Sequence, residues 1–221
     1  VANKILKSTD AGSTWNVTTI PSFNYYNSFD LKFINYNTGF LQGTYSYNPQ
    51  IYKTTNSGTS WDRFSINGND SLTSFYFLNE NTGWIGSAKS KQYYKTTNAG
   101  VSWITYTISS LGENEHWQKS FFLNENTGWM RTEYSIGYKT TNGGASWIQL
   151  SYGFSNNAIF LNEMTGFSFG SDIYKTTNGG ANWVSQNVQD YTYLAFSENN
   201  TDGVAVGKYG KMLTTTNTGA N

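Results

Sequence analysis

The sequence predicts an all-β protein, a β-propeller built from about five blades of four antiparallel strands. Two short segments that recur along the chain, and the composition, lead to this prediction. Aromatic residues make up 18% of the 221 residues, whereas there are only 2 prolines. Such a composition is typical of many short strands joined by tight turns. No window shows the 3.6-residue periodicity of a helix.

The first repeated segment reads Lys-Thr-Thr-Asn-x-Gly-x-x-Trp in four of its copies. A further copy carries Asp10 in place of Asn, and the last copy begins at Thr214 and runs to Asn221, one residue before the Trp position. Successive Asp or Asn positions are 46, 42, 44, 36 and 39 residues apart. A period near 40–45 residues is typical of a propeller blade. The copies occupy 7–15, 53–61, 95–103, 139–147, 175–183 and 214–221.

The second repeated segment reads Phe-Leu-Asn-Glu-Asn-Thr-Gly-Trp at 77–84 and returns at 33–40, 122–129 and 160–167, with a looser copy at 196–204. Each repeat therefore contains four strand patterns. Strand A is an apolar run such as Phe75–Leu78, Phe121–Leu123 or Ala158–Leu161. Strand B follows the Asn-Thr-Gly turn. Strand C is the Tyr-Lys-Thr-Thr stretch, and strand D begins at the Trp.

The nine-residue segment has a mechanical explanation within the hairpin of strands C and D. Its Asp or Asn side chain accepts backbone N–H groups, as in other Asx turns. The Gly two positions later adopts a backbone conformation that is costly for other residues, and the two Thr supply β-branched strand formers. The Trp buries a large apolar area between neighbouring blades. We therefore expect these residues to stabilise the fold and not to bind a ligand.

The segment Ser8 to Trp15 resembles the Asp-box, or bacterial neuraminidase repeat, with the pattern Ser/Thr-x-Asp-x-Gly-x-x-Trp. The longer pattern of Asn-Thr-Gly-Trp followed by Tyr-Lys-Thr-Thr-Asn-x-Gly-x-x-Trp is similar to the repeats of propellers like the photosystem II assembly factor. Related stretches occur in sortilin-type receptors, sialidases and xyloglucan-cleaving enzymes. The resemblance covers nearly the whole chain and implies a propeller. It does not define a function, because unrelated activities share such blades.

We predict a single domain over 1–221, since all-β domains of this length often form one unit. A strand C pattern occurs near the start, at Ile5–Ser8, and another near the end, at Lys211–Thr214. A five-bladed ring, closed by the strand D that follows Trp15, needs only one of them. A closed ring and a part of a longer array both fit this pattern.

The charge balance disfavours nucleic-acid and membrane partners. Lys and Arg number 14 and Asp and Glu number 14, so the net charge is zero, and no stripe of basic residues occurs. Non-specific nucleic-acid binding depends on a basic surplus. No apolar run approaches the ~20 residues that span a bilayer. We expect no nucleic-acid partner and no direct insertion into a membrane.

Metal and cofactor sites are not expected. The chain has no Cys and a single His, His116, so it lacks the ligands of a zinc site. The repeated turn carries neutral Asn in five of six copies, which suits calcium poorly. Its Gly-rich copies lack the Lys-Ser/Thr ending of a phosphate-binding loop. The sequence therefore predicts no cofactor and no bound metal.

The residues for catalysis are also missing, so we expect a protein that is not an enzyme. A sialidase holds its substrate carboxylate with three arginines, and this chain has only Arg63 and Arg131. A glycosidase needs two carboxylates about 5–9.5 Å apart. Glu80, Glu125 and Glu163 occupy equivalent turns and are interpreted as turn residues. The unrepeated acids, whose spacing singles out no pair, are Glu113, Glu115, Glu133, Asp172 and Asp190.

Blade-specific chemistry is expected in the loops between strands B and C and between successive blades. These loops lie at one end of a propeller, the top, and vary between repeats, whereas the repeated turns lie at the other end. Loops on a rigid scaffold are the usual place for binding, and aromatic faces suit sugar rings or protein surfaces. The candidate binding residues are Tyr25, Tyr26, Tyr45, Tyr47, His116, Trp117, Arg131, Tyr134, Tyr191 and Tyr209.

These features predict a non-enzymatic binding or scaffold module, secreted or at a bacterial surface, that mediates a protein–protein interaction. A glycan-binding, lectin-like propeller that uses the same aromatic residues is the first alternative. A fragment of a glycoside hydrolase is a second alternative. A photosystem assembly factor is a third, although that family is described as binding through an Arg-rich surface and this chain has two arginines.

Overall fold

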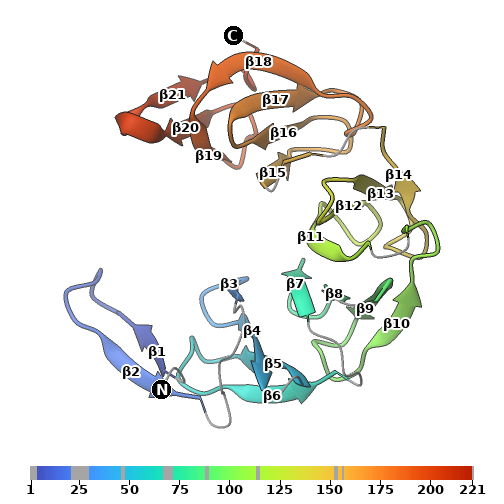
Figure 1. Ribbon diagram of the computed structural model, residues 1–221. Coiled ribbons are helices and arrows are strands. Elements are labelled where there is room, and N and C mark those ends of the chain that lie inside the picture. The colour runs from blue at the N-terminus through green and yellow to red at the C-terminus, as the bar shows by residue number, and fades with distance from the viewer. Residues whose placement is uncertain are drawn as a thin grey trace. The chain divides into compact units, whose positions relative to one another are not determined.

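The computed structural model describes residues 4–20, 30–45, 48–66, 72–87, 90–112, 115–151, 154–155 and 157–220. Every regular element there is a β-strand except one short 3-10 helix at Lys208–Gly210 (Figure 1). The chain divides into two compact units, Val1–Ser120 and Phe121–Asn221. The single domain over 1–221 stays a prediction, and each unit is described by itself.

The first unit contains one two-stranded sheet and two four-stranded sheets, in each of which the strands pair in chain order and antiparallel. The two-stranded sheet consists of β1 (Lys4–Lys7) and β2 (Asn16–Thr19). The next consists of β3 (Asp30–Phe33), β4 (Gly39–Tyr45), β5 (Asn48–Thr54) and β6 (Asp62–Ser65). The last consists of β7 (Leu72–Phe77), β8 (Gly83–Ser87), β9 (Gln92–Thr96) and β10 (Ile104–Thr107).

The second unit continues the same order. Its first sheet contains β11 (Trp117–Phe122), which crosses the unit boundary, β12 (Gly128–Thr132), β13 (Gly137–Thr140) and β14 (Ile148–Gln149). The next contains β15 (Asn157–Phe160), β16 (Gly166–Phe169), β17 (Asp172–Thr176) and β18 (Val184–Gln189). A three-stranded sheet contains β19 (Tyr191–Phe196), β20 (Gly203–Gly207) and β21 (Met212–Thr215).

The four-stranded antiparallel sheets are the blades that the repeats predict, so the predicted propeller fold is confirmed. Each blade runs from strand A to strand D in chain order. Both predicted copies of strand C at the two ends of the sequence also form. The first, β1, pairs with the strand D that follows Trp15, and the second, β21, pairs with strand B of the three-stranded sheet.

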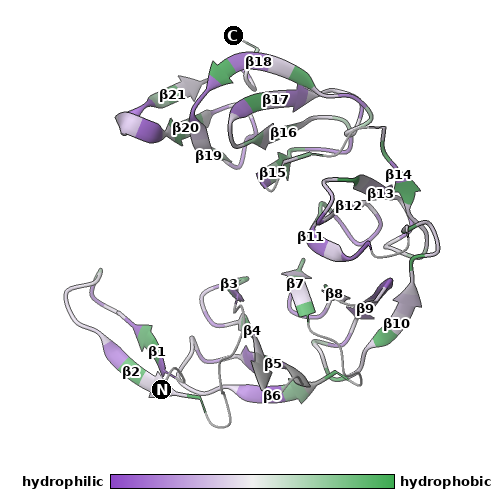
Figure 2. Cartoon of the chain, in the orientation of Figure 1, coloured by the Kyte–Doolittle hydropathy of each residue, from purple (hydrophilic) through white to green (hydrophobic). Residues whose placement is uncertain are grey.

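Burial differs between the inner and outer strands of a blade. The strand B positions of β8, β12 and β16 are buried along their whole length, whereas β10 and β14 at the outer edge are largely exposed. Strands that are covered on both faces are typically apolar along their length. The edge strand β18 instead mixes hydrophobic and hydrophilic residues (Figure 2). The core of each unit therefore lies between the faces of adjacent sheets.

The two repeated turns of each sheet are joined by one backbone hydrogen bond. A backbone N–H of the turn after strand C donates to a carbonyl of the turn after strand A, over 2.8–2.9 Å. The expectation that both turns lie at the same end of the blade is therefore confirmed in all five sheets that contain them. The bonds join Ser57 to Asn37, Ala99 to Asn81, Gly143 to Asn126, Gly179 to Met164, and Thr218 to Thr201.

The nine-residue turn is held by two side chains. The Asn178 Oδ1 atom accepts the Asn182 N–H at 2.9 Å, which is the role expected of this residue. The Thr176 Oγ1 atom accepts the Gly180 N–H at 2.9 Å and donates its own proton to Asn178 at 3.0 Å. Gly180 has a φ of +91°, the left-handed region that favours glycine. The first Thr is thus a hydrogen-bonding centre of the turn and more than a strand former.

Candidate functional site

Aromatic side chains join one blade to the next in the second unit. The Phe160 ring, at the end of strand A, lies over Gly166, where a Cβ atom would come within 2.6 Å of the ring. Trp129 of the preceding sheet stacks on the same ring at 3.6 Å between centroids. Trp183 packs edge-on against it at 5.7 Å, with an interplanar angle of 71°. Phe160 is therefore held by the strand B aromatic of one blade and the strand D Trp of its own.

The lysine of the nine-residue turn reaches from its own blade to the next. Lys139 Nζ donates to the Glu163 carbonyl at 3.0 Å and lies 5.1 Å from the centre of the Trp129 ring. Burial lowers the pKa of Lys139, and the Glu163 charge offsets part of that shift. Lys175 makes the equivalent contact with the Thr218 carbonyl at 2.8 Å, over the Phe167 ring. These lysines join adjacent sheets.

The repeated glutamates also join adjacent blades. The Glu163 carboxylate accepts the Thr127 hydroxyl of the preceding sheet at 3.1 Å. In the first unit, Glu80 accepts the Asn35 amide at 2.5 Å and the Thr38 hydroxyl at 3.3 Å. They are turn residues, as the repeat predicts, with the additional role of bridging two sheets.

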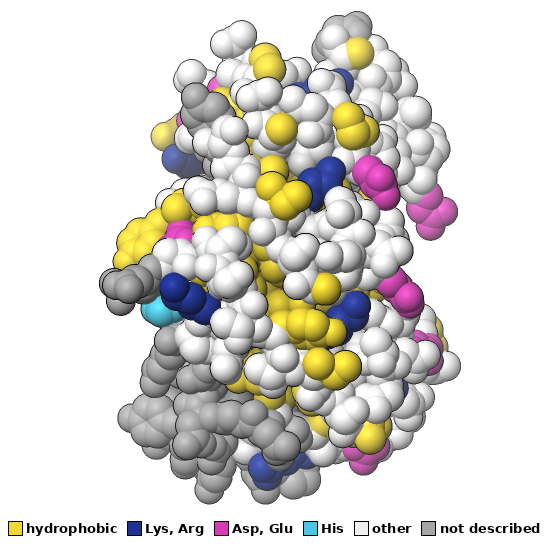
Figure 3. Space-filling model, turned by 90° about the vertical axis from the view of Figure 1, so that its right-hand side faces the viewer, with side chains coloured by type: hydrophobic (Ala, Val, Ile, Leu, Met, Phe, Trp, Pro, Cys, Tyr) yellow, Lys and Arg dark blue, Asp and Glu magenta, His cyan; other side chains and the backbone are white. Residues whose placement is uncertain are grey.

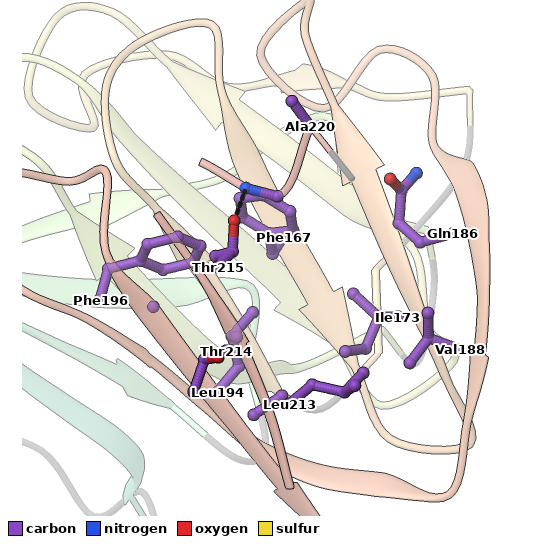
Figure 4. Close-up of a pocket in the computed structure, with 13 residues that line it drawn as sticks. Phe167, Ile173, Gln186, Val188, Leu194, Phe196, Leu213, Thr214, Thr215 and Ala220 are labelled. Carbon is purple, nitrogen blue, oxygen red and sulfur yellow. Dashed lines mark hydrogen bonds between the residues drawn. The ribbon is translucent and has the colours of Figure 1, made fainter. Parts of the chain in front are cut away.

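A cavity of about 440 Å³ lies between the β15–β18 sheet and the β19–β21 sheet (Figure 4). Phe196, which corresponds to Phe160, stacks on Phe167 with 5.0 Å between the ring centroids. Phe167 and Phe196 lie at one end of the cavity, and Ile173, Val188 and Leu213 lie at the other. The cavity takes in strands B, C and D of one blade and all three strands of the next.

The lining of this cavity is apolar apart from Gln186, Thr214 and Thr215, and no lining residue is titratable. The Thr215 hydroxyl accepts the Gly219 N–H at 2.9 Å, as the dashed line in Figure 4 shows. The cavity thus offers no group for proton transfer. Among the residues described, no three His, Asp or Glu side chains gather where they could hold a metal.

Three of the predicted binding residues are core side chains, which corrects their assignment to the surface. Trp117 is fully buried, lies 5.1 Å from the Tyr93 ring and donates from Nε1 to the Ser74 hydroxyl at 3.0 Å. Tyr191 is also buried, in the cluster between the last two sheets. Both are the first residue of a strand A, so each belongs to the packed sheet and not to the loop before it.

Arg131 is the third correction. It lies on strand B and is 6% exposed. Its Nε donates to the Phe154 carbonyl at 2.8 Å and its Nη2 to the Ser135 hydroxyl at 2.6 Å. Burial lowers the pKa of the guanidinium. Arg131 is therefore a buried side chain that holds the backbone at Phe154 and the turn at Ser135 in place.

Two predicted residues are strongly exposed. Tyr134 is 61% exposed in the turn after β12, and Tyr209 is 94% exposed in the turn after β20. Both turns join strand B to strand C in different blades, and His116 is half-buried before β11. The backbone of Tyr45 ends β4. The side chain of Tyr45, and Tyr25, Tyr26 and Tyr47 altogether, lie outside the described residues.

The unrepeated acids in the described residues have structural partners. Glu115 is buried and accepts the Gly112 N–H at 2.7 Å. Asp172 accepts the N–H groups of Ile173 and Val188 at 2.8 and 3.0 Å, and the Ser185 hydroxyl. These carboxylates hold loops and strand ends in place.

Asp190 and Glu133 complete the set of described unrepeated acids. Asp190 forms an ion pair with Lys211 at 2.9 Å, and this hydrogen bond holds its pKa below the usual value. Glu133 is half-buried, and Glu113 lies outside the described residues.

On the face shown in Figure 3, the Lys and Arg side chains stand apart from one another and form no continuous basic patch. The part of the chain that the structure describes contains no helix with the length and apolar character needed to cross a membrane.

Sequence reasoning missed the cavity. The available signal was Thr214, which lines the cavity and stands where the other copies of the nine-residue segment carry Lys.

No family model matches the sequence, and no curated protein matches it. Solved structures do match. YCF48 bound to a D1 peptide superposes with a TM-score of 0.70 and 16% identity over 97% of this chain and 72% of that chain. YCF48 from Cyanidioschyzon merolae gives a TM-score of 0.53 and 14% identity over 97% and 88%.

A GH74 enzyme from Niastella koreensis gives a TM-score of 0.58 and 16% identity. The match covers 85% of this chain but only 36% of the enzyme, so this chain spans about a third of the enzyme's length. At such low identities the likeness concerns the fold alone. The structures to which this chain is similar thus assign it a β-propeller fold.

Proposed function

We propose that the protein is a non-enzymatic extracellular module that binds or scaffolds a protein partner at a bacterial surface. The observation that carries the proposal is the likeness to YCF48 bound to a D1 peptide, since that structure shows a propeller of this fold holding a peptide.

The proposal gives the six nine-residue turns the role of Asp-box elements that stabilise the blades. It is supported by the Thr176, Asn178 and Gly180 hydrogen bonds, which belong to the turn itself. Because these residues use their hydrogen-bonding groups within the turn, few such groups remain for a ligand. The binding site is therefore sought at positions that differ between the repeats.

Hydrolase activity is the alternative that the GH74 likeness raises. A glycosidase needs one carboxylate as acid and another as base or nucleophile on the two sides of the scissile bond. Asp172 and Glu115 each accept backbone N–H groups that hold local structure. Such engagement favours a structural role for both, and it supports a protein that is not an enzyme.

Glycan binding is a second candidate, favoured by the exposure of Tyr134 and Tyr209. Tyrosine offers an apolar face with a polar end and suits sugar rings. Tyr209→Ala and Tyr134→Ala would each weaken glycan binding if this candidate is right.

The experiment has three arms that use the full chain. The immobilised protein is offered the surface fraction of the source bacterium, and a captured protein is then purified and titrated against it. A glycan array and a panel of plant and microbial polysaccharides form the other arms. The proposal expects a dissociation constant at or below the micromolar range for the purified protein, and neither glycan binding nor hydrolysis. Turnover that Asp172→Asn abolishes, or glycan binding without a protein partner, would overturn it.

A further inference from the structure

Every copy of the nine-residue turn places the residue after its Asp or Asn in the left-handed region. The φ values at this position run from +55° to +69° in the six copies. Glycine adopts this conformation without strain, whereas a residue with a Cβ does not. Gly occupies the position in two copies, as Gly143 and Gly179, and Ala, Ser or Thr occupies it in the others. These two copies therefore contain an Asn-Gly pair, with Asn142 and Asn178.

An Asn-Gly pair is chemically labile. Asn is among the thermolabile residues, and in this pair the backbone nitrogen of the Gly reaches Cγ of the Asn without hindrance from a side chain. The nitrogen attacks after it has lost its proton. Because both reactants belong to neighbouring residues, the step is intramolecular and strongly favoured by proximity.

The side chain that would be attacked is exposed, whereas the nitrogen that would attack is withheld. Both Asn residues are exposed and both Gly residues are buried. The Gly143 N–H donates to the Asn126 carbonyl at 2.8 Å, and the Gly179 N–H donates to the Met164 carbonyl at 2.8 Å. A buried N–H held in such a bond reacts with solvent only when the local structure opens. The bond between the two turns of a blade therefore protects the pair.

The hydrogen bonds of the side chain itself give no such protection. Oδ1 of Asn142 accepts the Thr140 hydroxyl at 3.0 Å and the Ser146 N–H at 2.9 Å. Donors in these positions polarise a carbonyl and stabilise negative charge on its oxygen. The reaction is therefore limited by access to the Gly nitrogen and not by the Asn side chain.

We propose that Asn142 and Asn178 are sites of self-modification, at which local opening of the two turns frees the Gly nitrogen and the Asn becomes an aspartate. The nitrogen gives its proton to solvent and forms a bond to Cγ. The bond from Cγ to Nδ2 breaks, and Nδ2 takes up a proton and leaves as ammonia. Water then adds to either carbonyl of the succinimide ring and opens it, which gives an aspartate or an isoaspartate. The inference is independent of the proposed partner.

An aspartate fits the turn, because the first copy already contains one. Asp10 accepts the Thr14 N–H at 2.8 Å through Oδ1 and the Thr14 hydroxyl at 2.6 Å through Oδ2. Asn142 makes the matching pair of bonds with Ser146, except that its Nδ2 donates to the hydroxyl at 2.9 Å. A carboxylate at this position requires the Ser146 hydroxyl to rotate and donate. The conversion thus changes an Asn copy of the turn into an Asp copy.

Packing of the preceding blade requires the Gly of the second pair. A Cβ built on Gly179 would collide with Lys139 Nζ and lie 2.7 Å from the Glu163 carbonyl oxygen. These two groups are hydrogen-bonded to each other at 3.0 Å. Ser57 and Ala99 occupy the equivalent position in other blades. A larger residue would remove the labile pair only by displacing the bridge between two sheets.

The first measurement compares the folded and the unfolded chain. The full chain is incubated at neutral pH with and without urea, and peptide mapping by mass spectrometry follows the conversion of each Asn. Enzymatic methylation of isoaspartate separates the two products. We expect both sites to convert at least tenfold more slowly in the folded chain, because reaction there requires local opening. Equal rates in the folded and the unfolded chain would overturn the inference.

Crossed variants identify the opening that controls each site. The Asn126 carbonyl belongs to a turn held by Asn124, whose Oδ1 accepts the Asn126 and Thr127 N–H groups at 2.9 and 2.8 Å. Asn162 holds the turn of Met164 in the same way, also over 2.9 and 2.8 Å. Loss of either side chain loosens one turn and leaves the reacting amide and its own turn intact.

Asn124→Ala should therefore speed the conversion of Asn142 at least threefold and leave that of Asn178 within twofold of wild type. Asn162→Ala should do the reverse, so each variant is the control for the other. Circular dichroism melting checks that both fold. Equal acceleration of both sites by either variant would assign the reaction to global unfolding and overturn the inference. Unchanged rates at both sites would overturn it as well.

Hydrogen exchange tests the inference without a variant. The same nitrogen loses its proton in exchange and in conversion, so NMR protection of the Gly143 and Gly179 amides should match the slowing of conversion at the preceding Asn within about threefold. Rapid exchange at a site that converts slowly would contradict the inference.

The fit of the product is tested with Asn142→Asp. This variant should melt no lower than wild type at neutral pH, because its carboxylate accepts the bonds that Asp10 accepts. A melting temperature well below that of wild type would show that the turn does not accommodate the product.

Discussion

The two sheet interfaces of the second unit are built on one plan, yet one is filled and the other is hollow. Between the β11–β14 and β15–β18 sheets, Phe160 lies between Trp129 at 3.6 Å and Trp183 at 5.7 Å. Between the β15–β18 and β19–β21 sheets, Phe196 has Phe167 on one side and a cavity of about 440 Å³ beside it. The same repeat thus forms a filled interface in one place and leaves a cavity in the other.

The difference shows what each repeated residue contributes. The turn forms through its own Thr, Asn and Gly hydrogen bonds, as the 176–180 and 215–219 turns show. Trp129 and Trp183 then pack on the Phe160 ring and fill the space around it.

The largest expected loss of stability comes from a variant of the filled interface. Trp129→Ala deletes a fully buried ring that stacks on Phe160 and donates to the Gly179 carbonyl at 2.8 Å. We expect it to lower the free energy of unfolding by about 3–5 kcal/mol. Val204 occupies the same strand B position in the last sheet, does not line the cavity and is 42% exposed, so Val204→Ala should cost about 1 kcal/mol or less. Urea denaturation measures both, and equal costs would mean that burial of the strand B side chain does not set the loss of stability.

A smaller effect is expected from the turn. Thr176→Val removes the hydroxyl that accepts two backbone N–H groups in a buried turn. Leaving them unsatisfied should cost about 1–3 kcal/mol. Thr215→Val removes the same bonds in a turn that water can reach, and about 1 kcal/mol or less is expected there.

The control for the turn is Thr177→Val, at the neighbouring exposed threonine just after β17. It should be near neutral in thermal melting. Thr176 is buried, whereas Thr215 is partly exposed. A larger loss of stability from Thr215→Val than from Thr176→Val would therefore contradict the expected link between burial and cost.

The smallest effect concerns the one copy of the turn that carries Asp. Hydrogen bonds from the Thr14 hydroxyl, the Thr14 N–H and the Ser8 hydroxyl lower the pKa of Asp10 from 3.8 to about 2. A carboxyl whose pKa is lowered on folding contributes stability above its unfolded value, and this contribution is lost as the pH falls from 3.8 towards 2. Carbon-13 NMR titration should give a midpoint near 2 for this exposed carboxyl. A midpoint near 3.8 would mean that these bonds do not hold in solution.

Much of the fold could be predicted because its determinants are local. The Asn-Thr-Gly turn and the nine-residue turn carry their own hydrogen bonds within a few residues, so their copies mark the strands. The predicted strand C at Ile5–Ser8 lies at Lys4–Lys7, a shift of one residue. What was not predictable is the contact between Trp129 and Phe160, since two sheets must first form and pack before the rings meet.

The candidate site was less predictable for a related reason. Trp117 and Tyr191 follow polar stretches and resemble loop residues, yet each begins a strand whose first side chain turns into the core. Arg131 is buried because the Phe154 carbonyl and the Ser135 hydroxyl satisfy its guanidinium, and these partners come together only in the folded chain.

The most direct test of the central claim is the titration of a purified captured protein against the full chain, beside a glycan array and a polysaccharide panel. We expect a dissociation constant at or below the micromolar range for the protein, and neither glycan binding nor hydrolysis. Turnover that Asp172→Asn abolishes, or glycan binding without a protein partner, would contradict it.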